Sequence, residues 1–148
     1  MRRMPARWLI GGGISNDGTL TVRKSTFVEN AAARAGGTIF NGGTAIIEKS
    51  TFSGNRSDGL NDEPFFSVVG LGGGIFTSGP LTVEHSTVTQ NSATGAGGGI
   101  YVCVDGSNFL SPGPAPLPPA QAPSGTCHGT LTLKHTSVTE NTPDNLFP

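Results

Sequence analysis

The sequence predicts an all-β fold, a single-stranded right-handed parallel β-helix of about four coils. Three short motifs each recur four times along the 148 residues at shared spacings, which indicates stacked structural repeats. The runs between glycine-rich turns alternate apolar and polar residues, as half-buried strands do. No helical periodicity is present, and the 23 Gly and 17 Thr residues disfavour helices. The right hand follows from the rule for parallel crossover connections.

The three motifs define a repeating unit of 25 residues. The first motif, Gly-Gly-x-Ile, ends at Ile14, Ile39, Ile75 and Ile100. A short apolar run follows it and starts at Leu20, Ala45, Leu81 and Leu131. The third motif, Phe/Val-x-x-Asn, starts at Phe27, Phe52, Val88 and Val138. The spacing of 25 residues grows to 36 and 50 where residues are inserted, at about 56–71 and 104–126.

The repeats divide the chain into three parts. Residues 11–142 form the β-helix, residues 1–10 a flank or partial cap, and residues 143–148 a C-terminal tail. The flank is basic, but its apolar stretch, Trp8 to Ile10, is shorter than the ~7–15 residues of a secretory signal. We therefore expect the chain to carry no export signal of its own and to be a piece of a longer protein. Because a β-helix exposes strand edges at both ends, we also expect either edge-mediated self-association or flanking coils that this sequence lacks.

Equivalent residues of stacked units lie about 4.8 Å apart and form columns. One column is predicted to be an asparagine ladder, in which each amide bonds to the next along the stack. Its members are Asn30, Asn55, Asn91 and Asn141. A glycine column is expected to supply the positive φ of a turn, and it contains Gly18, Gly43, Gly79 and Gly129. A hydroxyl column contains Ser25, Ser50, Ser86 and Thr136.

The charge balance excludes two classes of partner. Nine basic and ten acidic residues give a net charge of −1, which provides no electrostatic basis for binding nucleic acid or an anionic membrane. No apolar run approaches the ~18 residues of a membrane-spanning helix. We therefore expect no nucleic acid partner and no membrane span in this chain.

The candidate metal ligands are too few for a site. His85 and His135 would be neighbours in a column that begins with Lys24 and Lys49, but no third ligand is predicted beside them. The acidic run from Asp58 to Glu63 does not follow the calcium-loop pattern. We expect a solvated polar stripe and a solvated loop, with no metal and no cofactor.

Catalysis by this fold needs carboxylates in matching positions. Polysaccharide lyases require several of them around calcium, and hydrolases require a pair on successive coils. Here the aspartates fall in different columns or in insertions, at Asp17, Asp58, Asp62, Asp105 and Asp144. We therefore predict no catalytic residues. The glycan sequon at Asn55 is better explained by the asparagine ladder, because the other members of the ladder lack a sequon.

The two cysteines flank the second insertion, which contains six prolines between Pro112 and Pro123. The columns place Cys103 and Cys127 at adjacent positions, close enough for a disulfide. We predict a disulfide at the base of this proline-rich arm, with a pair of free thiols as the alternative. A disulfide would indicate an oxidising, extracytoplasmic setting.

The paired motifs resemble the repeats of the chlamydial polymorphic outer membrane proteins and, more broadly, of bacterial right-handed parallel β-helix surface proteins. Two segments, Phe27 to Asn30 and Phe52 to Asn55, meet Phe-x-x-Asn in full, and the two later ones start with Val. The Gly-Gly-x-Ile motifs have Gly or Thr where the family has Ala. The resemblance covers residues 11–142 and implies an exported adhesin, passenger domain or large surface protein.

The function expected from these observations is non-catalytic. We expect a surface or secreted β-helix scaffold, a fragment of a larger adhesin-like or passenger protein that contacts a host cell or a glycan. Its expected location is extracellular or on the outer membrane or cell surface. The alternative is a remnant of a carbohydrate-active β-helix lyase or hydrolase with a pectate lyase-like fold, and a third possibility is a gene remnant without activity.

Overall fold

The computed structural model describes residues 10–62, 66–104 and 127–148, and its regular elements are all β-strands. The first sheet contains, in order, β1 (Ile14–Asn16), β5 (Ile39–Asn41), β11 (Ile75–Thr77), β15 (Ile100–Val102) and β18 (Leu146–Phe147). The second contains β2 (Thr19–Arg23), β6 (Thr44–Glu48), β12 (Pro80–Glu84) and β16 (Thr130–Lys134). The third contains β3 (Thr26–Val28), β7 (Thr51–Ser53), β13 (Thr87–Thr89) and β17 (Ser137–Thr139). A short fourth sheet contains β4 (Ala31–Ala32), β8 (Arg56–Ser57) and β14 (Ser92–Ala93).

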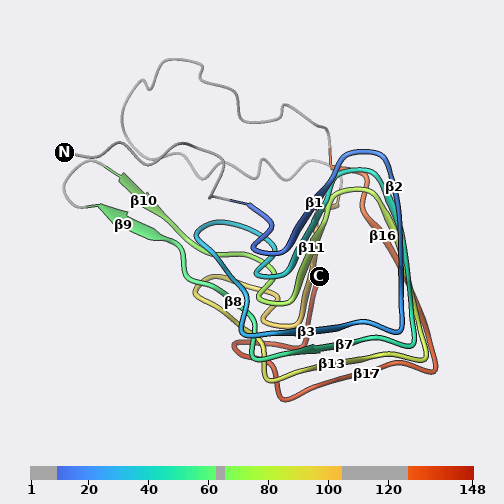
Figure 1. The fold of residues 1–148 in the computed structure, drawn as a ribbon. Coiled ribbons are helices and arrows are strands. Elements are labelled where there is room, and N and C mark those ends of the chain that lie inside the picture. Colours follow the sequence, from blue (N-terminus) through green and yellow to red (C-terminus); the bar gives the residue numbers. More distant parts are fainter. Residues whose placement is uncertain (1–9, 63–65, 105–126) are drawn as a thin grey trace.

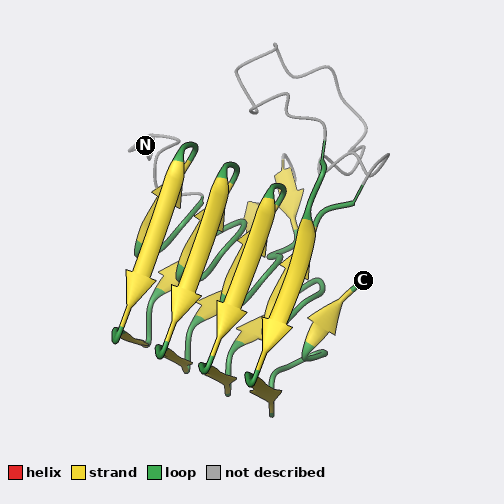
Figure 2. Cartoon of the chain, turned by 90° about the vertical axis from the view of Figure 1, so that its right-hand side faces the viewer, coloured by secondary structure: helices red, strands yellow, loops and turns green. Residues whose placement is uncertain are grey.

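All pairings within these four sheets are parallel, so the chain is a parallel β-helix, as predicted. Figure 1 looks along the stack, and the strands outline a triangle with the third sheet at the bottom and the second at the right. Figure 2 shows the strands of the second sheet side by side, with one turn of the chain behind each of them. The right hand of the helix stays a prediction.

The register of the strands confirms the motif alignment. The isoleucines of Gly-Gly-x-Ile pair in sequence order across the first sheet. The starts of the apolar runs pair across the second sheet, and Phe27, Phe52, Val88 and Val138 pair across the third. Each residue therefore has its own equivalent as its neighbour in the next unit.

The main core fills the inside of the triangle. Its fully buried members include Ile39, Ile75 and Ile100 from the first sheet and Phe52 from the third. The ring of Phe52 stacks on that of Phe27, with centroids 4.9 Å apart. Phe27 is only half-buried because no described strand lies on the outer side of β3.

A second apolar cluster, which the sequence analysis did not predict, lies on the outer face of the first sheet. Its rings stack in the order Phe40, Phe76, Tyr101 and Phe147, with centroids 5.1–5.3 Å apart. Phe40 and Phe76 are buried, and the disulfide cysteines belong to the same cluster. Strand residues therefore pack on both faces of this sheet, inward at Ile75 and outward at Phe76.

The expected role of one glycine column is wrong. Gly18, Gly43, Gly79 and Gly129 do not have positive φ. Gly43 and Gly79 are needed for close backbone approach, because a Cβ on Gly79 would overlap the carbonyl oxygen of Gly43. Positive φ instead marks three other corners of the unit, occupied by Gly11, Gly36, Gly72 and Gly97, by Lys24, Lys49, His85 and His135, and by Glu29, Gly54, Gln90 and Glu140.

Two boundaries differ from those expected. Arg56 and Ser57 belong to the stack as β8, so the first excursion lies between Asp58 and Gly70 and contains an antiparallel hairpin of β9 (Leu60–Asp62) and β10 (Phe66–Val68). Figure 1 shows this hairpin projecting away from the triangle. The residues expected to form a C-terminal tail instead add β18 to the first sheet, where Leu146 pairs with Ile100.

We predict that Phe52→Ala lowers the free energy of unfolding by about 3–5 kcal/mol, because it empties a fully buried site between Phe27 and Val88 in the column. Phe27→Ala is the matched control and should cost less, because Phe27 is half-buried. Urea unfolding followed by circular dichroism measures both. Equal losses for the two variants would contradict this description of the core.

We also predict that Gly79→Ala destabilises the fold strongly, whereas Gly18→Ala in the same column is tolerated. A Cβ at Gly79 meets backbone of the neighbouring unit, but a Cβ at Gly18 meets no atom within 4 Å. Thermal unfolding of the two variants shows whether this column needs glycine for close backbone approach or for turn conformation. A large drop in the unfolding temperature of Gly18→Ala would show that the column needs glycine for its conformation.

Candidate functional site

The buried polar groups of the stack form a continuous asparagine ladder. The backbone N–H and the Nδ2 group of each Asn both donate to the Oδ1 atom of the next Asn. The donor–acceptor distances are 2.8–2.9 Å along Asn30, Asn55, Asn91 and Asn141. Asn55 and Asn91 are essentially inaccessible to solvent. The sequon at Asn55 is therefore not a glycosylation site of the folded chain.

The C-terminal residues extend this ladder. Asn145 Oδ1 accepts from the N–H and Nδ2 of Asn141 at 3.0 and 3.1 Å, as a further ladder member would. Asp144 Oδ1 accepts from the N–H groups of Gly97 and Gly98, at a corner where backbone carbonyls accept in the preceding units. Residues 144 and 145 thus occupy acceptor positions that equivalent residues of the next unit supply elsewhere in the stack. The sequence pattern does not predict this role, because neither residue lies at a repeat spacing.

Two further polar columns hold the units together. In the hydroxyl column, the N–H of Ser25, Ser50 and Ser86 donates to the hydroxyl of the next member at 3.0–3.4 Å. In the other column, Asn16 Nδ2 donates to Asn41 Oδ1, and Asn41 Nδ2 donates to Thr77 Oγ1. The second column was missed by sequence reasoning, although the 25-residue spacing of Asn16 and Asn41 could have revealed it.

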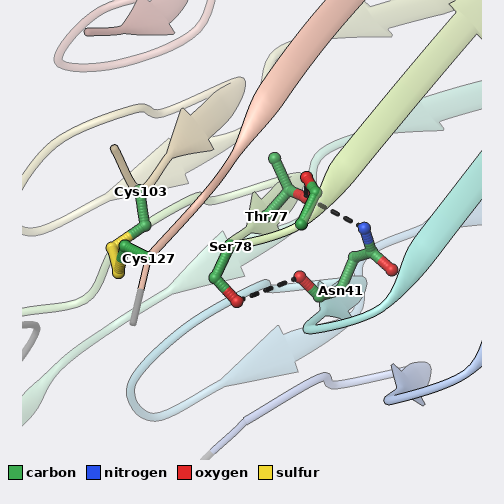
Figure 3. The surroundings of a disulfide bond; sticks show 6 residues. Asn41, Thr77, Ser78, Cys103 and Cys127 are labelled. Carbon is green, nitrogen blue, oxygen red and sulfur yellow. Dashed lines mark hydrogen bonds between the residues drawn. A yellow bond between two sulfur atoms is a disulfide. The ribbon is translucent and has the colours of Figure 1, made fainter. Parts of the chain in front are cut away.

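A disulfide joins Cys103 and Cys127, whose Cα atoms are 5.2 Å apart. Figure 3 shows it beside Ser78, at the corner where the chain leaves β15 and returns to β16. The N–H of Cys103 donates to Thr77 O, and the N–H of His128 donates to Ser78 O. One end of the second excursion is therefore fixed to Thr77 and the other to Ser78, which are adjacent residues of the preceding unit. The proline-rich residues 112–123, and with them Asp105, lie outside the described residues.

The candidate metal ligands lie on the surface. His85 and His135 stack with ring centroids 4.9 Å apart, at left-handed corners that Lys24 and Lys49 continue. Asp58 pairs with Arg56 at 2.8 Å, and Glu63 lies outside the described residues. No group of three or more His, Cys, Asp or Glu residues that could hold a metal occurs within the described ranges.

The charged column next to the histidines forms two exposed ion pairs. Arg23 contacts Glu48 at 3.0 Å, and Lys134 contacts Glu84 at 2.7 Å. The hydrogen bond from Lys134 lowers the pKa of the Glu84 carboxyl below its ordinary value, and the positive charge of Lys134 acts in the same direction. These pairs connect neighbouring units. Asp17, Asp58 and Asp144 lie at separate corners, and Asp144 is engaged at the C-terminal end.

We predict that Cys103→Ser combined with Cys127→Ser destabilises the chain by about 3 kcal/mol in the chain-entropy model, because the disulfide closes a loop with a sequence separation of 24. Urea unfolding of oxidised and reduced protein provides the measurement, and the reduced wild type should match the double variant. Thiol titration of the oxidised chain under denaturing conditions is the check, and two free thiols would contradict the disulfide.

We predict that Lys134→Gln moves the pKa of Glu84 back toward its ordinary value. Because the folded-state pKa is the lower one, the ion pair stabilises the fold above the unfolded-state pKa. This contribution is lost as the pH falls through the folded-state pKa. An NMR titration of the Glu84 carboxyl in both chains measures the shift. An unchanged pKa in the variant would show that Lys134 is not its cause.

Comparison with known proteins identifies one repeat. The model of the Chlamydia polymorphic membrane protein repeat matches residues 85–103, the segment that runs from the corner after β12 to the residue that follows β15. Neither a curated protein nor a solved structure matches the chain. Within the described residues, no helix is long and apolar enough to cross a membrane. Residues 85–103, which carry Val-x-x-Asn and Gly-Gly-x-Ile, thus match a Chlamydia polymorphic membrane protein repeat, and they do so within a parallel β-helix.

Proposed function

We propose that the chain is a non-catalytic scaffold of a surface-exposed or secreted protein, in which a rigid stack presents excursions for contact with a cell or a glycan. One observation carries the proposal. The second excursion leaves and returns at one corner of the stack, where a disulfide and backbone hydrogen bonds to Thr77 and Ser78 fix both of its ends. Such a base positions an excursion on a rigid element, which is how binding loops are commonly supported.

The chemistry of the stack also supports a structural role. The asparagine, hydroxyl and mixed columns use their polar groups to bond one unit to the next. The exposed carboxylates Glu48 and Glu84 are paired with cations of neighbouring units. A glycosidase needs two carboxyl groups placed across one bond, and Asp17, Asp58 and Asp144 lie at different corners. The alternative of a remnant lyase or hydrolase therefore has less support.

A location outside the cytoplasm fits the same proposal. The disulfide requires an oxidising compartment to persist. The matched repeat comes from a family of membrane proteins. We propose that the chain acts at the cell surface or in the extracellular space, as part of an adhesin-like or passenger protein.

The test compares the full chain with a variant in which residues 105–126 are replaced by a short Gly-Ser linker. Both are labelled and applied to cultured epithelial cells and to immobilised neutral and acidic polysaccharides. We expect the full chain to bind one of these surfaces. We expect the linker variant to keep its circular dichroism spectrum and urea midpoint but to lose binding.

Equal binding by the linker variant would show that the stack itself makes the contact, and this would contradict the proposal. Absence of binding by both chains would also contradict it. The same polysaccharides, incubated with the full chain, provide the enzymatic control. Release of unsaturated or reducing sugar ends would favour the lyase or hydrolase alternative.

A further inference from the structure

A row of basic residues runs along one side of the stack, at the corner between the second and third sheets. Each member directly follows the last residue of a strand of the second sheet, so neighbouring members are one strand spacing apart. In Figure 2 the arrowheads of these strands end in one row at this corner. All members are exposed, and we refer to them as the basic row: Lys24, Lys49, His85 and His135.

The backbone of this corner does not explain why its residues are basic. All four have φ between 47° and 50°, a left-handed conformation that Gly and Asn adopt at the lowest cost. Another left-handed corner of the unit contains only glycines, and the third contains no cation. The basic side chains therefore contribute something other than the turn.

The charges of the basic row are not neutralised within the stack. In the neighbouring column of the second sheet, Arg23 pairs with Glu48 and Lys134 pairs with Glu84. Among the described residues, by contrast, Lys24 and Lys49 form no ion pair. The Glu84 carboxylate is close enough to both histidines to respond to their charge, but it is bonded to Lys134. The row thus has two unbalanced positive charges at neutral pH and four when both imidazoles are protonated.

This surface lies on the side of the stack, where coils added at either end would lengthen the row without covering it. Every described unit turns this corner without an inserted residue, since the hydroxyl column follows the row directly. The second excursion joins the stack at the opposite end of β16, and the first follows β8. Figure 1 places the hairpin of the first excursion on the other side of the triangle from this lower right corner. The row is therefore continuous over three strand spacings, about 14 Å.

The columns beside the row fit a sugar polymer better than a nucleic acid or a membrane. A straight row of like charges repels itself and is relieved by a linear polyanion that follows it. The flanking column of the third sheet has hydroxyls that can exchange hydrogen bonds with sugar hydroxyls. Base stacking needs aromatic side chains and membrane insertion needs apolar ones, and neither flanking column contains any. The flanking hydroxyl residues are Thr26, Thr51, Thr87 and Ser137.

We propose that the basic row binds a linear acidic polysaccharide along the stack, and that binding strengthens when His85 and His135 become protonated. Histidine gains its charge between about pH 8 and pH 5, so acidification doubles the unbalanced charge of the row. Glu84 does not cancel this gain, because Lys134 lowers the pKa of its carboxyl and keeps it ionised. This surface goes beyond the proposed role of the second excursion and does not rest on it.

Binding to immobilised polysaccharides tests the proposal, with heparin as the sulfated probe, polygalacturonate as the carboxylated probe and dextran as the neutral one. At about pH 5.5 and low salt, the full chain should bind heparin or polygalacturonate but not dextran. The dissociation constant should rise by about 3- to 30-fold at about pH 7.5, because two exposed charges are lost. Equal binding to dextran, or no binding to either acidic probe at the lower pH, would overturn the proposal.

Histidine variants test the source of the pH dependence. His85→Gln combined with His135→Gln should remove the difference between the two pH values. The matched control is His128→Gln, because this third histidine of the chain lies before the other end of β16, and it should behave as the wild type. Calorimetry in two buffers at about pH 6.5 should show proton uptake on heparin binding, which the double variant lacks. A pH dependence that persists in the double variant would contradict the assignment to the row.

Lysine variants test the row itself. Lys24→Gln combined with Lys49→Gln should weaken binding at both pH values, whereas Arg56→Gln on the fourth sheet should change it little. Gln90 has a φ of 56°, so glutamine is compatible with a left-handed corner of this stack, and circular dichroism should show both variants folded. Equal binding by the lysine variant and the wild type would overturn the proposal.

Two further comparisons separate this surface from other partners and from the second excursion. Tighter binding to a single-stranded oligonucleotide or to phosphatidylserine vesicles than to both acidic polysaccharides would overturn the proposal. The variant with a linker in place of residues 105–126 should keep the acid-dependent binding, and its loss would also overturn the proposal. Contact of the second excursion is measured at neutral pH in about 0.15 M salt, where the two lysines are largely screened. The two proposals therefore fail independently.

Discussion

The structure depends on one constraint, that each residue packs against its own equivalent one strand spacing away. Only side chains that can repeat at this distance are tolerated in a buried column. Isoleucines and phenylalanines stack, amides and hydroxyls bond to one another, and glycines allow backbones to approach. Like charges repel at this distance, and the two neighbouring carboxylates of the charged column, Glu48 and Glu84, are each paired with a cation of the unit on their other side. The low content of charged residues, 13%, follows from the same constraint.

The constraint also determines where variation is possible. A unit can be interrupted only where the chain leaves and returns without disturbing the columns. Both excursions satisfy this condition, between Asp58 and Gly70 and between Cys103 and Cys127. The flanking strands keep their register on either side. Function in such a molecule is expected in the excursions and at the ends, because the side chains at the stacked positions are needed to hold one unit to the next.

Much of the fold could be predicted from the sequence because each repeated position is occupied by a residue type that has one structural role in such a stack. The isoleucine, phenylalanine and asparagine columns were read from spacing alone. The glycine column was located correctly but explained wrongly, since spacing does not separate a positive φ at Gly72 from close approach at Gly79. The hydrogen bonds of Asp144 and Asn145 to the last unit could not be predicted, because these residues occur once and have no equivalent at a repeat spacing. The outer ring stack of Phe40 and Phe76 was missed because both faces of the first sheet are packed.

The asparagine ladder is the most direct test of the stacking account, because its bonds exist only when the units are in register. Asn91 is buried between Asn55 and Asn141, and it both accepts from one and donates to the other. The measurement is the urea unfolding free energy of Asn91→Ala beside the exposed neighbouring change Gln90→Ala. The account predicts a loss of at least about 1–3 kcal/mol for Asn91→Ala, because buried donors lose their acceptor, and little change for Gln90→Ala. A stability of Asn91→Ala equal to that of the wild type would contradict it.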